Sequence, residues 1–351
     1  VTLMCLAEAL LRIPDEATKD ALIKDKLSEK EWKKHLDKDN SLFVNASTWG
    51  LAIAGNLINL SDDSIGTLFK NTTKPVIRKA VDRAMRIMGQ HFVLGRTIKE
   101  AMKNAKPYLK KGYDYSYDML GESAVTADEA KRYLDSYSDA LTQIAKHAKG
   151  LARRPSLSIK LSALHPRFEE TQRIRVIKEL GQSVYSLVKL GMDLDVGITI
   201  DAEEADRMEL TLALFESIYS KPEVRGWGKF GLVVQAYSKR ALPALCWLTK
   251  LAKTHGDEIP VRLVKGAYWD SEIQHSQTHG LSGYPVFTRK EYTDTSYLAC
   301  ARFLLSETTR GCIYPQFATH NAHTVSSIKV MAPKARKFEF QRLHGMGDGL
   351  Y

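Results

Sequence analysis

The segment VRLVKGAYWD, residues 261–270, combines an apolar run with side chains that are able to bind a ligand. Val261, Leu263 and Val264 favour a strand buried on both faces, and a lysine, a glycine and two aromatic rings follow without a polar loop. Parallel α/β folds place their chemistry at the carboxyl ends of strands. The segment therefore favours a binding surface for a flat, anionic ligand.

Lys160 lies within the run SLSIKLSAL, and Asp201 stands at the end of the run DVGITIDAE. On adjacent strands, an inward lysine and an inward aspartate can meet, and each lowers the cost of burying the other. Two interpretations stay open. The pair is either a structural ion pair, or a site in which Lys160 binds a substrate carboxylate while Asp201 holds the lysine.

Donors and cations follow three consecutive predicted strands: Gln235, Tyr237, Arg262, Lys265, Thr288 and Lys290. Taken singly, each is an ordinary surface residue. Their shared position at strand ends favours one long dinucleotide lying across them, with its pyrophosphate on the cations.

Carboxylates and imidazoles also follow the third and sixth predicted strands: Glu203, Glu204, Asp206, His320 and His323. Such groups are typical of metal-dependent hydrolases. The H-x-x-H spacing at a strand end directs the two rings apart, however, and no third histidine has clear spacing. We therefore expect no bound metal, and helix capping or hydrogen bonding to a cofactor explains His320 and Asn321 equally well.

Seven β-rich runs separated by helical patterns organise the chain from residue 115 onward. They are residues 115–120, 156–164, 195–203, 230–237, 261–269, 314–321 and 338–346. Alternating strands and helices predict βα units and a parallel sheet, because parallel neighbours need a crossover. Each run ends in polar or reactive residues, as a (βα)8 TIM-like barrel requires. A doubly wound sheet is disfavoured, because no G-x-G-x-x-G follows the first run.

The predicted domains are a helical arm over residues 1–105 and a barrel over residues 106–351. Asp15 after Pro14 is typical of a helix start, residues 74–89 carry one apolar face, and residues 97–111 predict a further helix. Seven strands leave an eight-stranded barrel with two exposed edges, which natural proteins avoid. We therefore expect the last βα unit to be absent from this chain.

The net charge of +10 suits a polyanionic partner, but the lysines are dispersed along helical stretches, which favours solvated helix faces. We expect no nucleic-acid binding through this region and no chemistry in residues 1–105. The four cysteines, Cys5, Cys246, Cys300 and Cys312, form no C-x-x-C pair, which favours a reducing compartment.

Several long motifs carry a family resemblance: SIKLSALHPR, IDAEEADR, RLVKGAYWDSEI, YPQFATHNAH and FEFQRLHGMG. Together with the N-terminal LMCLAEALLRIPD and SLFVNASTWG, they make the whole chain resemble the proline dehydrogenase domain of the bifunctional proline utilization A family. The resemblance implies a distorted (βα)8 barrel that binds FAD without a Rossmann domain. It also implies oxidation of L-proline to pyrroline-5-carboxylate by hydride transfer to the flavin, with a membrane quinone as electron acceptor.

The resemblance implies FAD contacts at Val233, Gln235, Arg262, Val264, Lys265, Gly266, Ala267, Trp269, Thr288, Lys290, His320, Asn321, Gln341 and Leu343. It places Arg262 near the flavin N5, where negative charge develops. Substrate contacts would fall on Lys160, Asp201, Tyr268 and Leu343.

The chain departs from the family at its end, because the Tyr-x-x-Arg-Arg element that grips the substrate carboxylate is absent. Glu122, which would pair with one of those arginines, would then lack that partner, and a non-catalytic scaffold stays open as an alternative. We expect neither the ribbon-helix-helix DNA-binding module nor the aldehyde dehydrogenase module of full-length relatives. The resemblance implies a cytoplasmic protein with peripheral association to the inner membrane.

Overall fold

The chain forms two compact units, Val1–Leu94 and Gly95–Tyr351. The computed structural model describes residues 15, 18, 93–119, 121, 123–148, 151 and 154–351. In the first unit, the Thr18 backbone N–H donates to Asp15 Oδ1 at 2.8 Å, which is the capping contact of the predicted helix start. The predicted helix over residues 74–89 lies outside the described residues.

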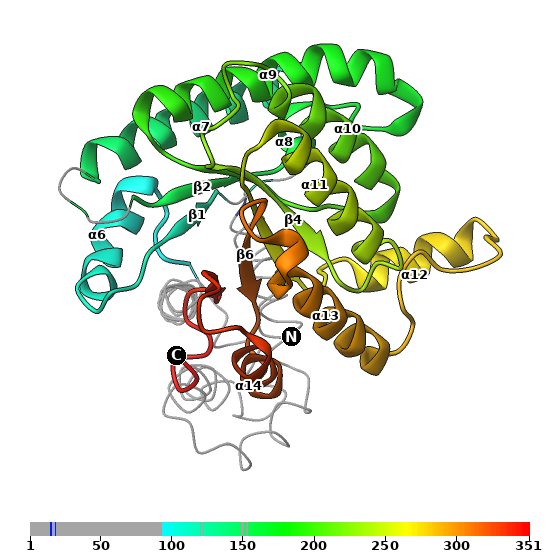
Figure 1. Ribbon diagram of the computed structural model, residues 1–351. Helices are drawn as coiled ribbons and strands as arrows, with labels where there is room; N and C mark the ends of the chain where they lie inside the picture. Colours follow the sequence, from blue (N-terminus) through cyan, green and yellow to red (C-terminus); the bar gives the residue numbers. More distant parts are fainter. Residues whose placement is uncertain are drawn as a thin grey trace, which may run out of the picture. The chain divides into compact units, whose positions relative to one another are not determined.

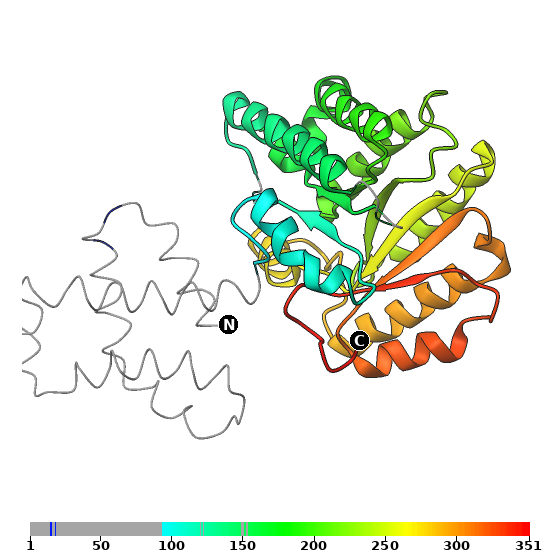
Figure 2. The same cartoon turned by 90° about the vertical axis from the view of Figure 1, so that its left-hand side faces the viewer.

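Seven parallel strands form the sheet of the second unit, and each pairs with the next strand in sequence. They are β1 (Ser116–Asp118), β2 (Ser156–Ile159), β3 (Ile198–Ile200), β4 (Phe230–Gln235), β5 (Ile259–Val264), β6 (Ile313–Ala318) and β7 (Glu339–Gln341). Figures 1 and 2 show the strands curled together inside a layer of helices. The predicted barrel-like fold with seven strands is therefore confirmed.

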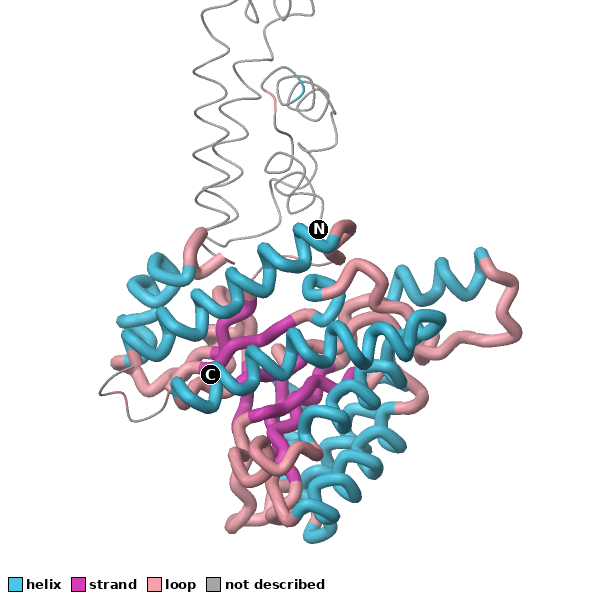
Figure 3. The backbone as a smooth tube through the Cα atoms, turned by 90° about the horizontal axis from the view of Figure 1, so that it is seen from above, coloured by secondary structure: helices cyan, strands magenta, loops and turns pink. Residues whose placement is uncertain are grey.

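The helices of this unit lie outside the strands, as Figure 3 shows. They are α6 (Ile98–Leu109), α7 (Ala127–His147), α8 (Leu161–Leu164), α9 (Arg173–Leu194), α10 (Met208–Tyr219), α11 (Ala241–His255), α12 (Trp269–Thr278), α13 (Lys290–Leu305) and α14 (Ala322–Met331). Short 3-10 turns lie at Glu170–Gln172, Ala205–Arg207 and Glu307–Thr309. Helix α6 confirms the helix predicted over residues 97–111, and the predicted domain boundary at 105 falls inside it.

Alternation along the strands separates a buried core from a polar interior. In β5, residues Ile259, Val261 and Leu263 are fully buried, whereas Arg262 and Val264 are only partly buried. Successive side chains of a strand point to opposite faces, so the apolar set packs under the helices and Arg262 faces the interior. The prediction that this strand is buried on both faces was therefore wrong.

The strand predicted over residues 156–164 ends at Ile159, because α8 begins at Leu161. Lys160 is the residue between them, with its backbone still extended at φ −106° and ψ 128°. The side chain is thus carried at the carboxyl end of β2 and not inside the strand.

The two edges of the sheet, β1 and β7, are not paired with each other. Residues after β7 contact the segment before β1 instead. The Tyr113 hydroxyl donates to the Tyr351 carbonyl at 3.2 Å, and the Arg342 guanidinium lies 5.0 Å from the centre of the Tyr113 ring. The end of the described chain therefore packs across the opening of the sheet.

Candidate active site at the carboxyl ends of the strands

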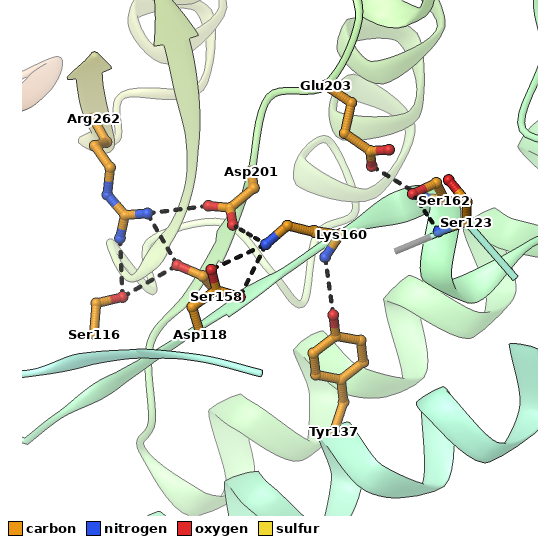
Figure 4. Close-up of polar contacts among 10 residues, drawn as sticks. All are labelled: Ser116, Asp118, Ser123, Tyr137, Ser158, Lys160, Ser162, Asp201, Glu203 and Arg262. Carbon is orange, nitrogen blue, oxygen red and sulfur yellow. Dashed lines mark hydrogen bonds and ion pairs between the residues drawn. The ribbon is translucent and has the colours of Figure 1, made fainter. Parts of the chain in front are cut away.

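Four charged side chains meet at the carboxyl ends of β1, β2 and β3 and inside β5 (Figure 4). Lys160 Nζ lies 2.9 and 3.0 Å from the two carboxylate oxygens of Asp118 and 3.1 Å from Asp201 Oδ2. Arg262 Nη1 donates to Asp201 Oδ1 at 3.1 Å. Asp201 therefore bridges two cations, and the predicted meeting of Lys160 with Asp201 is found in the structure.

Arg262 is held by three further strands. Its Nε donates to Gln341 Oε1 at 2.6 Å, its Nη1 to Ser158 Oγ at 3.0 Å and its Nη2 to Ser116 Oγ at 2.9 Å. The planar guanidinium offers several donors in fixed directions, so this set of acceptors fixes its orientation. The guanidinium therefore spans the interior between β1, β2, β3 and β7.

The position of Lys160 is fixed from the helix side as well. Its backbone N–H donates to the hydroxyl of Tyr137 at 3.2 Å, and Tyr137, from α7, is only 1% exposed. A buried N–H at the end of a strand needs such a partner. The helix α7 thus sets where β2 ends and where the lysine points.

The cluster raises the pKa of both Lys160 and Asp118. Burial lowers the pKa of Lys160, but the attraction of Asp201 and Asp118 outweighs this effect, and its pKa lies above the ordinary value. Lost hydration, with the repulsion of Asp201 added, raises the pKa of Asp118 against the attraction of Lys160.

Gln235 links two of the loops that follow the strands. Its Nε2 donates to the Glu203 carbonyl at 2.8 Å, and the Ala267 backbone N–H donates to its Oε1 at 3.2 Å. The Glu203 carboxylate accepts the Ser162 backbone N–H at 3.0 Å and pairs with Arg207 at 2.9 Å. These hydrogen bonds therefore connect the segments that follow β2, β3 and β5 and fix their positions relative to one another.

His320 and Asn321, which follow β6, both accept hydrogen bonds from backbone N–H groups of the protein. The Leu343 backbone N–H donates to His320 Nε2 at 2.9 Å, and Asn321 caps α14 by accepting from the Thr324 backbone N–H at 2.9 Å. Within the part of the chain that the structure describes, no group of three or more histidine, cysteine, aspartate or glutamate side chains is arranged to hold a metal ion. The hydrolase alternative thus has no ligand set in the described residues.

The segment after β5 requires glycine at position 266. Gly266 has φ +141°, and a Cβ placed there would lie 2.5 Å from the ring of Tyr237. The backbone therefore passes directly over this aromatic ring. Beyond it, Trp269 is 41% exposed, and its Nε1 donates to the Phe287 carbonyl at 2.9 Å.

Other residues predicted to contact FAD surround the same end of the sheet. Lys265 and Lys290 both pair with Asp294 of α13, an anion that the sequence analysis missed. Thr288 is exposed, and Leu343 is 65% exposed. Val233 and Val264 flank Arg262 along the strands, and Tyr268 is half-buried at the start of α12.

The sequence analysis also missed Asp118, Ser116, Ser158 and Tyr137. Asp118 could have been found, because it ends the first predicted strand as Asp201 ends the third. Ser116 and Ser158 carry no signal in sequence that separates them from surface serines. Glu122, predicted near the substrate, lies outside the described residues.

The second unit is an open, parallel βα barrel, and its ion cluster lies at the carboxyl ends of the strands. Enzymes with a βα barrel have their active sites at this end. Residues 101–351 match the family model described as proline dehydrogenase. The chain belongs to the proline dehydrogenase family.

The PutA relatives share sequence along the whole chain. The bifunctional protein PutA of Klebsiella aerogenes is 51% identical over 100% of this chain and 27% of its own length. PutA of Escherichia coli strain K12 gives the same values, 51%, 100% and 27%. Proline dehydrogenase 1 of Bacillus subtilis is 26% identical over 80% of this chain and 82% of its own length. The chain thus spans 27% of the length of these PutA relatives.

Solved structures of proline utilization A have a similar fold. That of a Bradyrhizobium japonicum mutant is 48% identical with a TM-score of 0.73, covering 99% of this chain and 36% of the other. That of the Bdellovibrio bacteriovorus protein, inactivated by N-propargylglycine, is 26% identical with a TM-score of 0.76, covering 93% and 38%.

Residues 1–92 match a second family model, described as the DNA-binding domain of proline dehydrogenase. This match corrects the expectation that the region has no nucleic-acid partner. That expectation rested on the dispersal of the lysines, but the spacing of charges along a sequence does not show where they gather on a folded surface. No helix among the described residues is both long and apolar enough to cross a bilayer.

Proposed function

We propose that the barrel oxidises L-proline to pyrroline-5-carboxylate with FAD as the hydride acceptor and passes the electrons to a membrane quinone. The observation that carries this proposal is the cluster of Lys160, Asp201 and Arg262 at the mouth of a proline dehydrogenase family barrel. Proline offers one carboxylate and one amine on a small apolar ring. A site for it needs a fixed cation, an apolar wall and a dry face.

Lys160 supplies the cation for the proline carboxylate. Its ammonium stays charged although its side chain is only 10% exposed, because Asp118 and Asp201 neutralise it. Tyr268 and Leu343 would form the apolar wall around the ring. Leu343 is 65% exposed, so its apolar surface is available to a ligand.

The residues at the strand ends fit a flavin dinucleotide. Trp269 and Leu343 expose apolar surface beyond β5 and β7, and exposed apolar side chains favour ligand binding. Gln235, Gln341 and His320 bring polar groups close to them, and Lys265 and Lys290 bring cations for a pyrophosphate. The other predicted contacts are Val233, Val264, Gly266, Ala267, Thr288 and Asn321.

When bound, the flavin would accept the electron pair and hydrogen of the ring carbon next to nitrogen, while the nitrogen lone pair forms the C=N bond. Arg262 is the cation best held for this step, because four acceptors fix its guanidinium before any ligand arrives. A cation fixed in advance stabilises developing negative charge without reorganisation.

Spectroscopy of the purified chain tests the proposal. We expect the protein to carry flavin absorbance, L-proline to bleach it under anaerobic conditions, and a soluble quinone analogue to restore it. The variant Lys160→Met should retain the flavin but require far more proline for bleaching. A chain that binds flavin and is not bleached by proline would refute the proposed reaction and favour the non-catalytic scaffold.

We infer a second function, DNA binding by residues 1–92. Its support is the match of these residues to the DNA-binding family model. Affinity for a DNA duplex should fall steeply as salt rises, because bound phosphates release counterions. Fluorescence anisotropy at several salt concentrations measures this. Equal binding by the chain and by a variant lacking residues 1–92 would refute it.

A further inference from the structure

Asp118 differs from the other members of the ion cluster in its exposure. Its side chain is 43% exposed, compared with 10% for Lys160, 15% for Asp201 and 13% for Arg262. Asp118 ends β1, so its carboxylate lies at the open mouth of the barrel. A ligand that enters from solvent and approaches Lys160 therefore reaches Asp118 at the same time.

The contacts of the two aspartates also differ. Asp118 presents both carboxylate oxygens to Lys160 Nζ, at 2.9 and 3.0 Å. Asp201 presents one oxygen to Lys160, at 3.1 Å, and the other to Arg262, at 3.1 Å. Asp201 thus also pairs with Arg262 and is less exposed. Asp118 is therefore the partner of Lys160 that a ligand carboxylate can replace with less rearrangement of the site.

We propose that Asp118 is a positioning residue that occupies the Lys160 ammonium in the empty site and has to share it with the substrate carboxylate when the site fills. The inference rests on the proposed function, in which Lys160 binds that carboxylate. Asp118 holds the lysine at the mouth, and its negative charge weakens the binding of every anion there. The site therefore admits a carboxylate only when the rest of the ligand, including its ring and amine, adds enough binding energy.

The size of the effect follows from the geometry. Two carboxylates that share one ammonium, each about 3 Å from it, lie roughly 5 to 6 Å apart. At an effective dielectric constant of about 40, between the protein and water values, their repulsion weakens binding roughly tenfold. Removal of the Asp118 charge should therefore strengthen the binding of a simple carboxylate by about that factor, which a purely structural role would not do.

The test measures the binding of cyclopentanecarboxylate, an unreactive ring carboxylate, to the flavin-loaded protein by isothermal titration calorimetry. We expect Asp118→Asn, which keeps the side-chain volume, and Asp118→Ala to lower the Kd about tenfold by the estimate above. Asp135→Asn removes an equal charge from an exposed position on α7 and should leave the Kd unchanged. Thermal unfolding and flavin content show whether each variant is folded.

An unchanged or higher Kd in both Asp118 variants would overturn the proposal. So would loss of the folded state, because a residue that only occupies the lysine at the mouth is not needed for folding. Bleaching of the wild-type flavin by proline distinguishes a failure of the proposed function from a failure of the role of Asp118. If the wild type is bleached and the Kd does not fall, the role of Asp118 alone is wrong. If the wild type is not bleached, the proposed function falls and this inference falls with it.

Discussion

Replacement of Asp201 by asparagine is expected to destabilise the barrel measurably. Asp201 is the shared anion of Lys160 and Arg262, with contacts of 3.1 Å to each. Asparagine keeps the shape but removes the charge, and its amide nitrogen would face one of the two cations. Breaking a buried ion pair by removing one partner costs about 3 to 5 kcal/mol.

The lower end of that range applies here. The Asp201 side chain is 15% exposed, so water screens the pair in part, and Asp118 still contacts Lys160. We therefore expect Asp201→Asn to reduce the free energy of unfolding by about 3 kcal/mol. For a unit of this size, such a loss lowers the Tm by roughly 6 to 12 °C.

Circular dichroism during heating measures the Tm, with the flavin content of each sample matched. The control is Asp193→Asn, an exposed aspartate on α9, which should change the Tm little. The double variant Asp201→Asn/Arg262→Gln should regain part of the loss, because it removes one of the unpaired cations. An Asp201→Asn shift no larger than that of the control would refute the reasoning that the cluster depends on its shared anion.

Three further predictions concern neighbouring groups. Tyr137→Phe leaves the Lys160 backbone N–H buried without its hydroxyl partner, so it should lower the free energy of unfolding by about 1 to 3 kcal/mol in urea titrations. It should also raise the KM for proline, because it disturbs the position of Lys160. An unchanged stability would contradict this prediction. Gly266→Ala should lower the ratio of flavin to protein, because a Cβ would lie 2.5 Å from the Tyr237 ring at φ +141°; full flavin content would show that the segment adapts. The raised pKa of Lys160 means that its ion pairs stabilise the fold fully below the unfolded pKa of about 10.4 and lose this effect as pH rises through the higher folded pKa. The stability difference between the wild type and Lys160→Met, measured in urea from pH 7 to pH 12, should therefore shrink at the alkaline end, and a difference independent of pH would contradict the assignment.

Local patterns were sufficient to predict the strands and their order. Seven apolar runs, each with a polar end, gave seven parallel strands, because the choice between strand and helix depends on spacing and length within a few residues. The same rule placed Lys160 near Asp201, since the carboxyl ends of parallel strands meet at one end of a barrel.

Details that depend on neighbours in space were not predictable in this way. The strand predicted over residues 156–164 ends early, because Tyr137 of α7 takes the Lys160 N–H and α8 begins at once. The pairing of Lys265 with Asp294 depends on how α13 packs against β5. Such contacts join residues that are distant in sequence, and no periodicity records them.

The sequence by itself determined the type of fold and the residue types at the strand ends, because alternation and strand propensity act over short stretches of chain. Only the tertiary structure decided which charges share a partner. It made Asp201 the bridge between Lys160 and Arg262 and brought Asp118 to the exposed side of the same lysine. The physical reason is that electrostatic and hydrogen-bonding energies depend on distances of a few ångströms, and those distances are set by the curvature and register of the sheet.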